Sequence, residues 1–231
     1  MSPLAIFLDA AGVLIDTTVM PAQWRRLAGE FFAPRLGGDP AAWGPANEWA
    51  ADRMWARYRD PKGTPNETHL RLRRIWLREM CERVGVPAPR TANELVIEAH
   101  EWICERVVAP LGDAVVGVRL LKADGHRLFT ATGQPSWEIA GYLRALGVRE
   151  LFEPKTYGSD LVDRWKTSRA FYSRMLADAG VSATAAIAID DQARCTAFAR
   201  AAGMRTFLMG ASESEEAVTT IAQLAVRLRA Y

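Results

Sequence analysis

Residues 4–16 read LAIFLDAAGVLID, and this stretch decides the fold. Residues 4–8 form an apolar run that is too short for a helix, and Asp9 closes the run just before a small turn, Ala-Ala-Gly. A short apolar run that ends in a polar turn is typical of a strand buried on both faces of a parallel sheet. The stretch therefore predicts the first strand of an α/β domain, with Asp9 at the carboxyl end of that strand.

Short apolar runs of the same kind recur later in the chain, at residues 126–132, 185–189 and 206–209. Helical patterns separate these runs, at residues 113–124, 136–146, 167–179 and 194–202. Strands that alternate with helices of this length build right-handed βαβ units. The sequence therefore predicts an α/β fold with a doubly wound, Rossmann-like parallel sheet and helices on both of its faces.

The stretch from residue 16 to residue 109 has a different character. It has no convincing strand, holds six of the eight tryptophans, and contains amphipathic segments at 67–84 and 92–108. Polar breaks at 36–40 and 60–66 divide it. We interpret this stretch as a helical insertion, so that residues 1–15 and 110–231 form the core domain and residues 16–109 form a second, helical domain.

The bulk composition excludes several classes of protein. With 231 residues, of which 49% are hydrophobic, the chain can bury a sizeable core. Its 29 basic and 27 acidic residues give a formal net charge of +2, which provides no reason to expect nucleic acid or an anionic membrane as a partner. Three cysteines without a CxxC pair argue against a disulfide framework or a zinc site. We expect a cytoplasmic monomer or homodimer that acts on a small molecule.

Polar residues close several of the predicted strands. Asp9 follows the first strand, Thr132 ends the second, and Asp190 and Asp191 follow the third. Ligands of open α/β sheets bind beyond the carboxyl ends of the strands. A single aspartate at such a place is equally consistent with a helix N-cap. Carboxylates that converge there repel one another, and a divalent cation relieves the repulsion, so the three aspartates together predict a Mg²⁺ site.

Lys166 is a further candidate for the site. The chain has only four lysines against 25 arginines, and this lysine opens the predicted helix that precedes the strand of Asp190. A lysine in that place would neutralise a nucleophilic aspartate and a transferring anionic group. Taken without the surrounding pattern, its position favours a surface lysine.

These residues together resemble the haloacid dehalogenase superfamily. Residues 7–16, FLDAAGVLID, resemble its first motif, an apolar strand that ends in Asp-x-Asp-Gly-(Thr/Val)-Leu. Residues 125–133, GHRLFTATG, resemble its second motif, in which a Ser or Thr ends the strand. Thr130 competes with Thr132 for this role, and the distance to the following Ala-Leu-Gly favours Thr132.

The later part of the chain carries the other two motifs in the expected order. Residues 159–166, SDLVDRWK, are similar to the third motif, and residues 187–204 are similar to the fourth. One large subgroup of the family has a helical cap between its first and second motifs. The resemblance therefore implies that residues 16–109 are such a cap.

The resemblance also implies a mechanism, in which Asp9 attacks phosphorus and forms an aspartyl phosphate that water hydrolyses. Thr132 and Gly133 would bind a phosphoryl oxygen, and Lys166 would offset negative charge on the nucleophile and the substrate.

The same resemblance implies the ligands of a cofactor, Mg²⁺. Asp9, the backbone carbonyl of Ala11 and Asp191 would hold the ion, and Asp190 would support it through water or orient the loop.

Four positions depart from the family pattern. Ala11 stands where most phosphatases of the family have a second aspartate that protonates the leaving alcohol, a contribution worth about 10²- to 10⁴-fold in rate. Cys195 stands where an Asp or Asn usually supports the metal, Gly133 replaces a common Asn, and Thr167 replaces the usual Pro.

Four functions remain open. We favour a Mg²⁺-dependent phosphatase of a small metabolite, which either uses an unusual acid, such as a cap residue or water, or has a substrate whose leaving group needs little protonation. A carbon–phosphorus hydrolase resembling phosphonoacetaldehyde hydrolase also carries Ala at position 11, but it needs a cap lysine, and Lys62 is the only one. A 2-haloacid dehalogenase needs neither acid nor metal, but it usually has an aromatic residue at position 11 and Asn at position 133. The fourth is a binding protein that keeps the fold without the chemistry.

The remaining conspicuous residues of the insertion have plain structural explanations. Large aromatics at helical spacing are more often core than pocket walls, and this applies to Trp43, Trp49, Trp55 and Trp76. We expect a solvated helix face from Arg71, Arg73, Arg74 and Arg78. No metal-ligand spacing links His69, His100 and His126.

Overall fold

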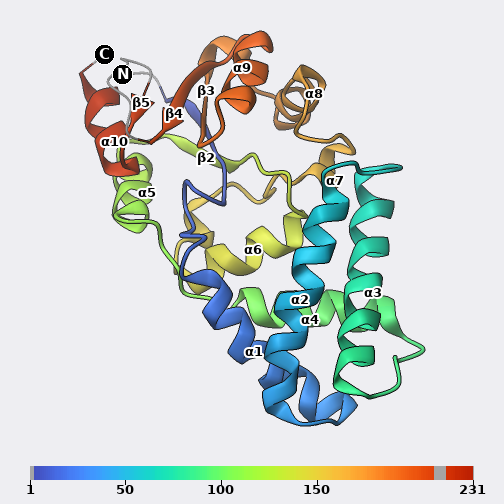
Figure 1. Ribbon diagram of the computed structural model, residues 1–231. Helices are drawn as coiled ribbons and strands as arrows, with labels where there is room; N and C mark the ends of the chain where they lie inside the picture. Colours follow the sequence, from blue (N-terminus) through green and yellow to red (C-terminus); the bar gives the residue numbers. More distant parts are fainter. Residues whose placement is uncertain (1–2, 211–216, 231) are drawn as a thin grey trace.

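The computed structural model describes residues 3–210 and 217–230, whose strands form one five-stranded parallel sheet in the order β2-β1-β3-β4-β5 (Figure 1). The strands are β1 (Ala5–Leu8), β2 (Arg127–Thr130), β3 (Ala186–Asp190), β4 (Arg205–Met209) and β5 (Ala217–Val218). In the register of the sheet, Leu8 pairs with Thr130 on one side and with Ile189 on the other. The chain runs outward from β1 in both directions, so β1 and β3 lie at a topological switch point, where ligands of such sheets bind.

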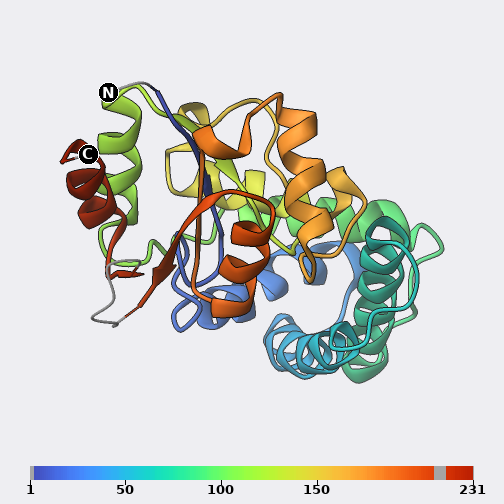
Figure 2. The same cartoon turned by 90° about the horizontal axis from the view of Figure 1, so that it is seen from above.

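Both faces of the sheet are covered, which explains why β1 is apolar throughout. Ile6 and Leu8 belong to the core cluster under α5 (Ala114–Ala123) and α10 (Ile221–Arg229). Phe7 belongs to the opposite cluster, under α8 (Arg169–Ala179) and α9 (Ala193–Ala201). Figure 2 shows the two helix pairs on opposite sides of the sheet. The predicted α/β fold with helices on both faces is confirmed.

The insertion after β1 folds into four helices that form the cap. They are α1 (Met20–Leu36), α2 (Pro40–Tyr58), α3 (Pro65–Val84) and α4 (Ala92–Cys104). The cap has its own apolar core, which includes Phe31, Phe32 and Trp43. Both predicted breaks fall at the junctions between helices, and within the second break a capping box of Thr64 and Glu67 begins α3. Figure 1 shows the cap beyond the end of β1.

The cap contacts the core mainly through α6 (Ser136–Ala145), the helix that follows the loop of Thr132. Gly141 of α6 lies so close to α4 that a Cβ added to it would be 2.7 Å from the Cβ of Cys104. An ion pair of 2.7 Å between Arg144 and Glu105 lies at the same contact. The absence of a side chain at Gly141 therefore sets how closely the cap approaches the core.

The prediction of individual elements was incomplete. Strand β5, helix α10 and two shorter pieces, α7 (Ser159–Val162) and the 3₁₀ turn η1 (Arg149–Leu151), were not predicted, and neither was the 3₁₀ turn η2 (Ala183–Ala185). Helix α8 begins at Arg169, so Lys166 lies in the loop before it and does not open the helix. No helix among the described residues is long and apolar enough to cross a membrane.

We predict that Gly141→Ala lowers the free energy of unfolding by about 1–3 kcal/mol, because the new methyl group overpacks the contact between α4 and α6. Chemical denaturation measures this. In an exposed helix interior the same change stabilises by up to about 1 kcal/mol, so a more stable variant would contradict the close contact.

A double-mutant cycle with Cys104→Gly is the control, since this second change removes the atom that the new methyl group meets. The two changes should be less destabilising together than the sum of their separate effects.

Candidate active site

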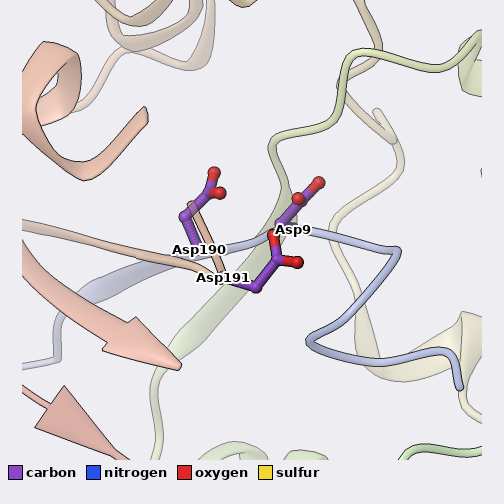
Figure 3. Close-up of side chains that lie close together, drawn as sticks. All are labelled: Asp9, Asp190 and Asp191. Atoms are coloured by element: carbon purple, nitrogen blue, oxygen red, sulfur yellow. The ribbon is translucent and has the colours of Figure 1, made fainter. Parts of the chain in front are cut away.

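Three aspartates meet at the carboxyl ends of β1 and β3 (Figure 3). Asp9 directly follows β1, Asp190 is the last residue of β3, and Asp191 is the next residue. The backbone N–H of Asp9 donates to the carbonyl of Ile189 at 3.0 Å, which extends the pairing of the two strands to the site. One carboxylate oxygen from each aspartate lies within 4.8 Å of the others. The structure thus brings together the three carboxylates that the sequence placed at strand ends.

Lys166 reaches the same point from the loop before α8. Its Nζ lies 2.9 Å from Oδ1 of Asp9 and 2.6 Å from Oδ2 of Asp190. Lys166 and these two aspartates are each more than 90% buried, whereas Asp191 is exposed. With all four groups ionised, three negative charges face one positive charge.

The burial and the crowding of charge change the pKa values in a consistent direction. Burial raises the pKa of Asp9, and Asp190 raises it further, while Lys166 opposes the rise. Burial and the neighbouring Asp9 likewise raise the pKa of Asp191. Burial alone would lower the pKa of Lys166, but the two carboxylates beside it raise the pKa above its ordinary value. The lysine is therefore an ammonium, and the site retains an excess of negative charge.

The loop after Asp9 is shaped around the carboxylate of Asp191. Gly12 has a φ of 76°, and a Cβ added to it would lie 2.4 Å from Oδ2 of Asp191. The N–H of Gly12 donates to the carbonyl of Ile15 at 3.0 Å, which folds the loop back on itself. Only glycine meets both demands, since it tolerates a positive φ and has no Cβ. Asp191 is held against the loop that contains Ala11.

The donor set fits a hard divalent cation. Asp9 and Asp191 offer carboxylate oxygens, and the excess negative charge favours a cation. Mg²⁺ prefers one or two carboxylates together with water and substrate phosphate oxygens. The residues present therefore fit the Mg²⁺ site that the sequence predicts.

The two threonine candidates of the second motif have different surroundings. Thr130 is fully buried, and its hydroxyl donates to the carbonyl of Tyr157 at 3.2 Å. Thr132 lies two residues beyond β2, lines the pocket together with Gly133, and accepts from the N–H of Gln134 at 3.3 Å. The geometry leaves only Thr132 available to a ligand.

A chain of hydrogen bonds joins the cap to the loop of Gly133. The hydroxyl of Ser159 donates to the carbonyl of Gly133 at 2.8 Å and lies 2.7 Å from Nε2 of His69. The hydroxyl hydrogen of Ser159 is donated to the carbonyl of Gly133, so Ser159 can only accept from His69. His69 therefore carries its proton on Nε2 and donates it to the Ser159 oxygen. Its Nδ1 then accepts from the hydroxyl of Tyr58 at 2.7 Å. Burial lowers the pKa of His69 to about 2, so the imidazole is neutral, as this chain requires.

A buried ion pair lies beside this chain. Arg73 of α3 donates from Nε to Glu138 of α6 at 2.6 Å, and both side chains are almost completely buried. Arg73 also donates to the hydroxyl of Tyr58 at 2.5 Å. The prediction of a solvated arginine face holds for Arg71, Arg74 and Arg78, which are exposed, and is wrong for Arg73. Glu138 balances the charge of Arg73, which allows it to be buried.

A pocket of about 600 Å³ lies between cap and core, and Asp9 is part of its lining. Its core side includes Asp9, Ala11, Thr132, Gly133 and Lys166. Its aromatic lining consists of Trp24, Trp55, Tyr58, His69, Trp76, His100, Tyr142 and Trp165.

The interpretation of the cap tryptophans as core residues is confirmed for Trp43, which is fully buried in the cap. It is wrong for Trp49 and Trp55, which are both exposed, and Trp55 lines the pocket. Trp76 belongs to the cap core and also lines the pocket. Sequence reasoning missed the pocket roles of Trp165 and Tyr58, although Trp165 directly precedes Lys166 in the third motif.

One departure from the family pattern, Cys195, and the cap lysine Lys62 can be placed in the structure. The thiol of Cys195 lies 3.7 Å from the backbone carbonyl of Lys166, so it contacts the segment that carries the lysine. Lys62 is exposed in the loop between α2 and α3 and is not among the pocket-lining residues.

The chain belongs to the haloacid dehalogenase-like hydrolase family, whose model matches residues 3–203. A comparison with curated protein sequences gives no match. Among solved structures, a defluorinating L-2-haloacid dehalogenase is similar over 98% of this chain and 95% of that chain, with 18% identity and a TM-score of 0.66.

A second L-2-haloacid dehalogenase matches 100% of both chains with 20% identity and a TM-score of 0.64. A HAD hydrolase from Bacillus subtilis, bound to magnesium, matches 99% of both chains with 15% identity and a TM-score of 0.63. At these identities the likeness concerns the fold, including its cap.

We predict that Lys166→Met lowers the free energy of unfolding at neutral pH by about 3–5 kcal/mol, because it leaves buried carboxylates without their counter-charge. Without the ammonium, the pKa of Asp9 in the folded protein rises further above its ordinary 3.8. The unfolded chain is ionised above about pH 4, so the loss should be complete at neutral pH and fade as the pH falls towards 4.

Denaturation in the presence of a chelator at several pH values tests this. The matched control is Lys155→Met, which removes an exposed ion pair with Asp178 of similar length and should cost about 0–1 kcal/mol. A loss that does not change between pH 7 and pH 4 would show that the carboxylates do not depend on Lys166.

Proposed function

We propose that this hydrolase is a Mg²⁺-dependent phosphatase that acts on a small phosphorylated molecule through a phosphoryl intermediate on Asp9. The observation that carries the proposal is the cluster of Asp9, Asp190 and Asp191 around Lys166, placed under a pocket. A buried nucleophile, a fixed ammonium and an excess of carboxylate are the parts that phosphoryl transfer needs, since it depends on positioning and charge stabilisation.

In the first step, a carboxylate oxygen of Asp9 forms a bond to phosphorus, and the bond from phosphorus to the leaving oxygen breaks with its electron pair on that oxygen. In the second step, water attacks the phosphorus, the bond to Asp9 breaks, and the carboxylate is regenerated with release of a proton to solvent. Lys166 and the loop of Thr132 and Gly133 stabilise the charge on the phosphoryl oxygens. Bound Mg²⁺ would add electrostatic stabilisation at Asp9 and Asp191.

Ala11 restricts the leaving group. Ala11 lines the pocket, and its methyl side chain cannot donate a proton to the leaving oxygen. General acid catalysis is worth about 10²- to 10⁴-fold for a leaving group that needs a proton. The proposed substrates are therefore those whose leaving oxygen is stable as an anion, such as phenolates and carboxylates.

A 2-haloacid dehalogenase is the second candidate, because it too needs no acid at position 11 and because several similar structures have this activity. Such a substrate carries a carboxylate that needs a cation. Lys166 is already shared by two aspartates, Arg73 is balanced by Glu138, and Arg194 at the pocket is exposed. Halide displacement needs no divalent cation, whereas the carboxylates of Asp9, Asp190 and Asp191 together fit one, so the phosphatase is the better account of the site.

The carbon–phosphorus hydrolase finds no support in the pocket. Its chemistry needs a lysine amine that reaches the substrate from the cap. Lys62 is exposed and outside the pocket lining, and Lys166 belongs to the core side of the site.

One experiment separates these functions. The purified protein is incubated with acetyl phosphate, phenyl phosphate, 2-chloropropionate and phosphonoacetaldehyde, each with Mg²⁺ and with a chelator. We expect inorganic phosphate from the first two substrates in Mg²⁺ only. Halide release in chelator would favour the dehalogenase, and no turnover under any condition would contradict an active hydrolase.

We predict that Asp9→Asn abolishes turnover, because an amide is a poor nucleophile and a poor Mg²⁺ ligand. Asp191→Asn should weaken Mg²⁺ binding, measured by calorimetry, and raise the Mg²⁺ concentration needed for half-maximal activity by at least about tenfold. Asp60→Asn, an exposed aspartate in the loop between α2 and α3, is the matched control and should change neither. Turnover by Asp9→Asn within tenfold of the natural chain would remove Asp9 from its role.

We predict that Ala11→Asp raises kcat/KM for an alkyl phosphate by about tenfold or more, since a carboxylic acid near the leaving oxygen supplies the missing proton. An aryl phosphate with a low leaving-group pKa should gain little. Rates for one alkyl and one aryl phosphate, measured with both proteins, give the comparison. An equal change in both rates would contradict the account of a missing acid.

A further inference from the structure

We infer that the pocket receives an uncharged aromatic group, so that the substrate is an aryl phosphate monoester whose phenolate leaves without a proton. This inference rests on the proposed phosphatase function and adds the class of substrate. Two independent observations carry it: the walls of the pocket, and the side chain at position 11.

One wall of the pocket is a run of aromatic rings from both domains. The ring centroids of Trp55 and Tyr58 are 5.3 Å apart, and those of Tyr58 and Trp165 are 6.2 Å apart. The ring centroid of His69 lies 5.3 Å from that of Trp165, so His69 continues this row of rings. Trp165 directly precedes Lys166, and its Nε1 donates to the carbonyl of Gly63 in the cap at 3.3 Å. This wall therefore adjoins the reacting centre.

The second wall comes from the inside of the cap. Trp24, Trp76 and His100 are in mutual contact, with centroid distances of 6.4 Å, 5.2 Å and 4.8 Å. Nε1 of Trp24 donates to the hydroxyl of Tyr142 in α6 at 2.9 Å, which fixes the orientation of its ring. Two sets of fixed aromatic rings offer edges and faces to a planar guest, which favours an aromatic guest over a flexible aliphatic one.

Among the residues that the structure describes, none in the interior of the pocket outside the catalytic cluster offers an unbalanced charge to a charged guest. His69 and His100 are neutral, because burial and then Arg73 lower the pKa of each ring. Arg73 itself is balanced by Glu138. The other charged residues in the cap and core lining outside the catalytic cluster are Glu48, which is paired with Arg25, and the exposed Asp52 and Arg194. A second phosphate or a carboxylate on the guest would lose hydration without gaining a buried partner.

The chemistry at position 11 leads independently to the same class. Without a general acid, the oxygen that leaves phosphorus must be stable as an anion. A phenolate is stable as an anion and also presents a ring to the aromatic walls. An aliphatic alkoxide is not a stable anion and has no ring. An acyl phosphate satisfies the first condition alone.

The test compares phenyl phosphate with acetyl phosphate, which both release a stable anion and of which only the first carries an aromatic ring. Because a carboxylate is a better leaving group than a phenolate, the comparison uses KM and the response of each substrate to the same substitution. We expect a lower KM for phenyl phosphate than for acetyl phosphate in the natural chain. Trp55→Leu should lower the ratio of the two kcat/KM values by on the order of tenfold, since it removes a ring from the first wall. Trp49→Leu is the matched control, because Trp49 is a partly exposed tryptophan of the same helix outside the pocket lining. It should leave the ratio unchanged.

The outcomes separate this inference from the proposed function. Turnover of acetyl phosphate in Mg²⁺ with a KM no higher than that of phenyl phosphate would overturn the aryl substrate and leave the phosphatase intact. No release of phosphate from either substrate would overturn both. A preference for phosphocholine over phenyl phosphate would also overturn the inference, since it would show that the rings bind a quaternary ammonium through cation–π contacts. A ratio that falls equally in Trp49→Leu would show that the first wall has no specific role.

Discussion

The structure depends on holding like charges together at one edge of a sheet. Because β1 and β3 are hydrogen-bonded neighbours, Asp9 and Asp190 emerge side by side, and Asp191 follows directly. Lys166 compensates only part of this charge, even though it contacts two of the three carboxylates. The remaining negative charge makes the site receptive to a cation and to a phosphate that shares it. Gly12 permits the loop of Ala11 to lie against Asp191 and so completes the arrangement.

The cap is tied to this site by polar groups as well as by packing. The chain from Tyr58 through His69 to Ser159 ends on the carbonyl of Gly133, in the loop proposed to bind phosphate. The Arg73–Glu138 pair crosses the same boundary, and neither partner can be removed without leaving a buried charge unpaired. A cap held in this way fixes the aromatic walls relative to the nucleophile. The position of the cap therefore determines the shape of the pocket.

The sequence predicted the position of a residue where that position depends only on the strand that carries it. The apolar run before Asp9 predicts β1, and parallel strands necessarily bring Asp9, Thr132 and Asp190 to one edge, so most of the candidate site could be predicted. The contact between cap and core could not be predicted, because it depends on how α3 and α4 pack against α6. Arg73 has the spacing of a surface arginine, and only the packing of Glu138 against it makes it a buried residue. Strand β5 has two residues, too few for a periodic pattern to reveal.

The central claim is that Asp9 becomes covalently phosphorylated, and rapid quenching tests it most directly. The protein is mixed with phenyl phosphate and Mg²⁺, quenched in acid within one turnover, and digested for mass spectrometry. The account predicts one added phosphoryl group on the peptide that contains Asp9, and none in Asp9→Asn treated in the same way. Release of phosphate without any modification of that peptide, or an ester on Asp9 formed from a 2-haloacid in the absence of metal, would contradict it.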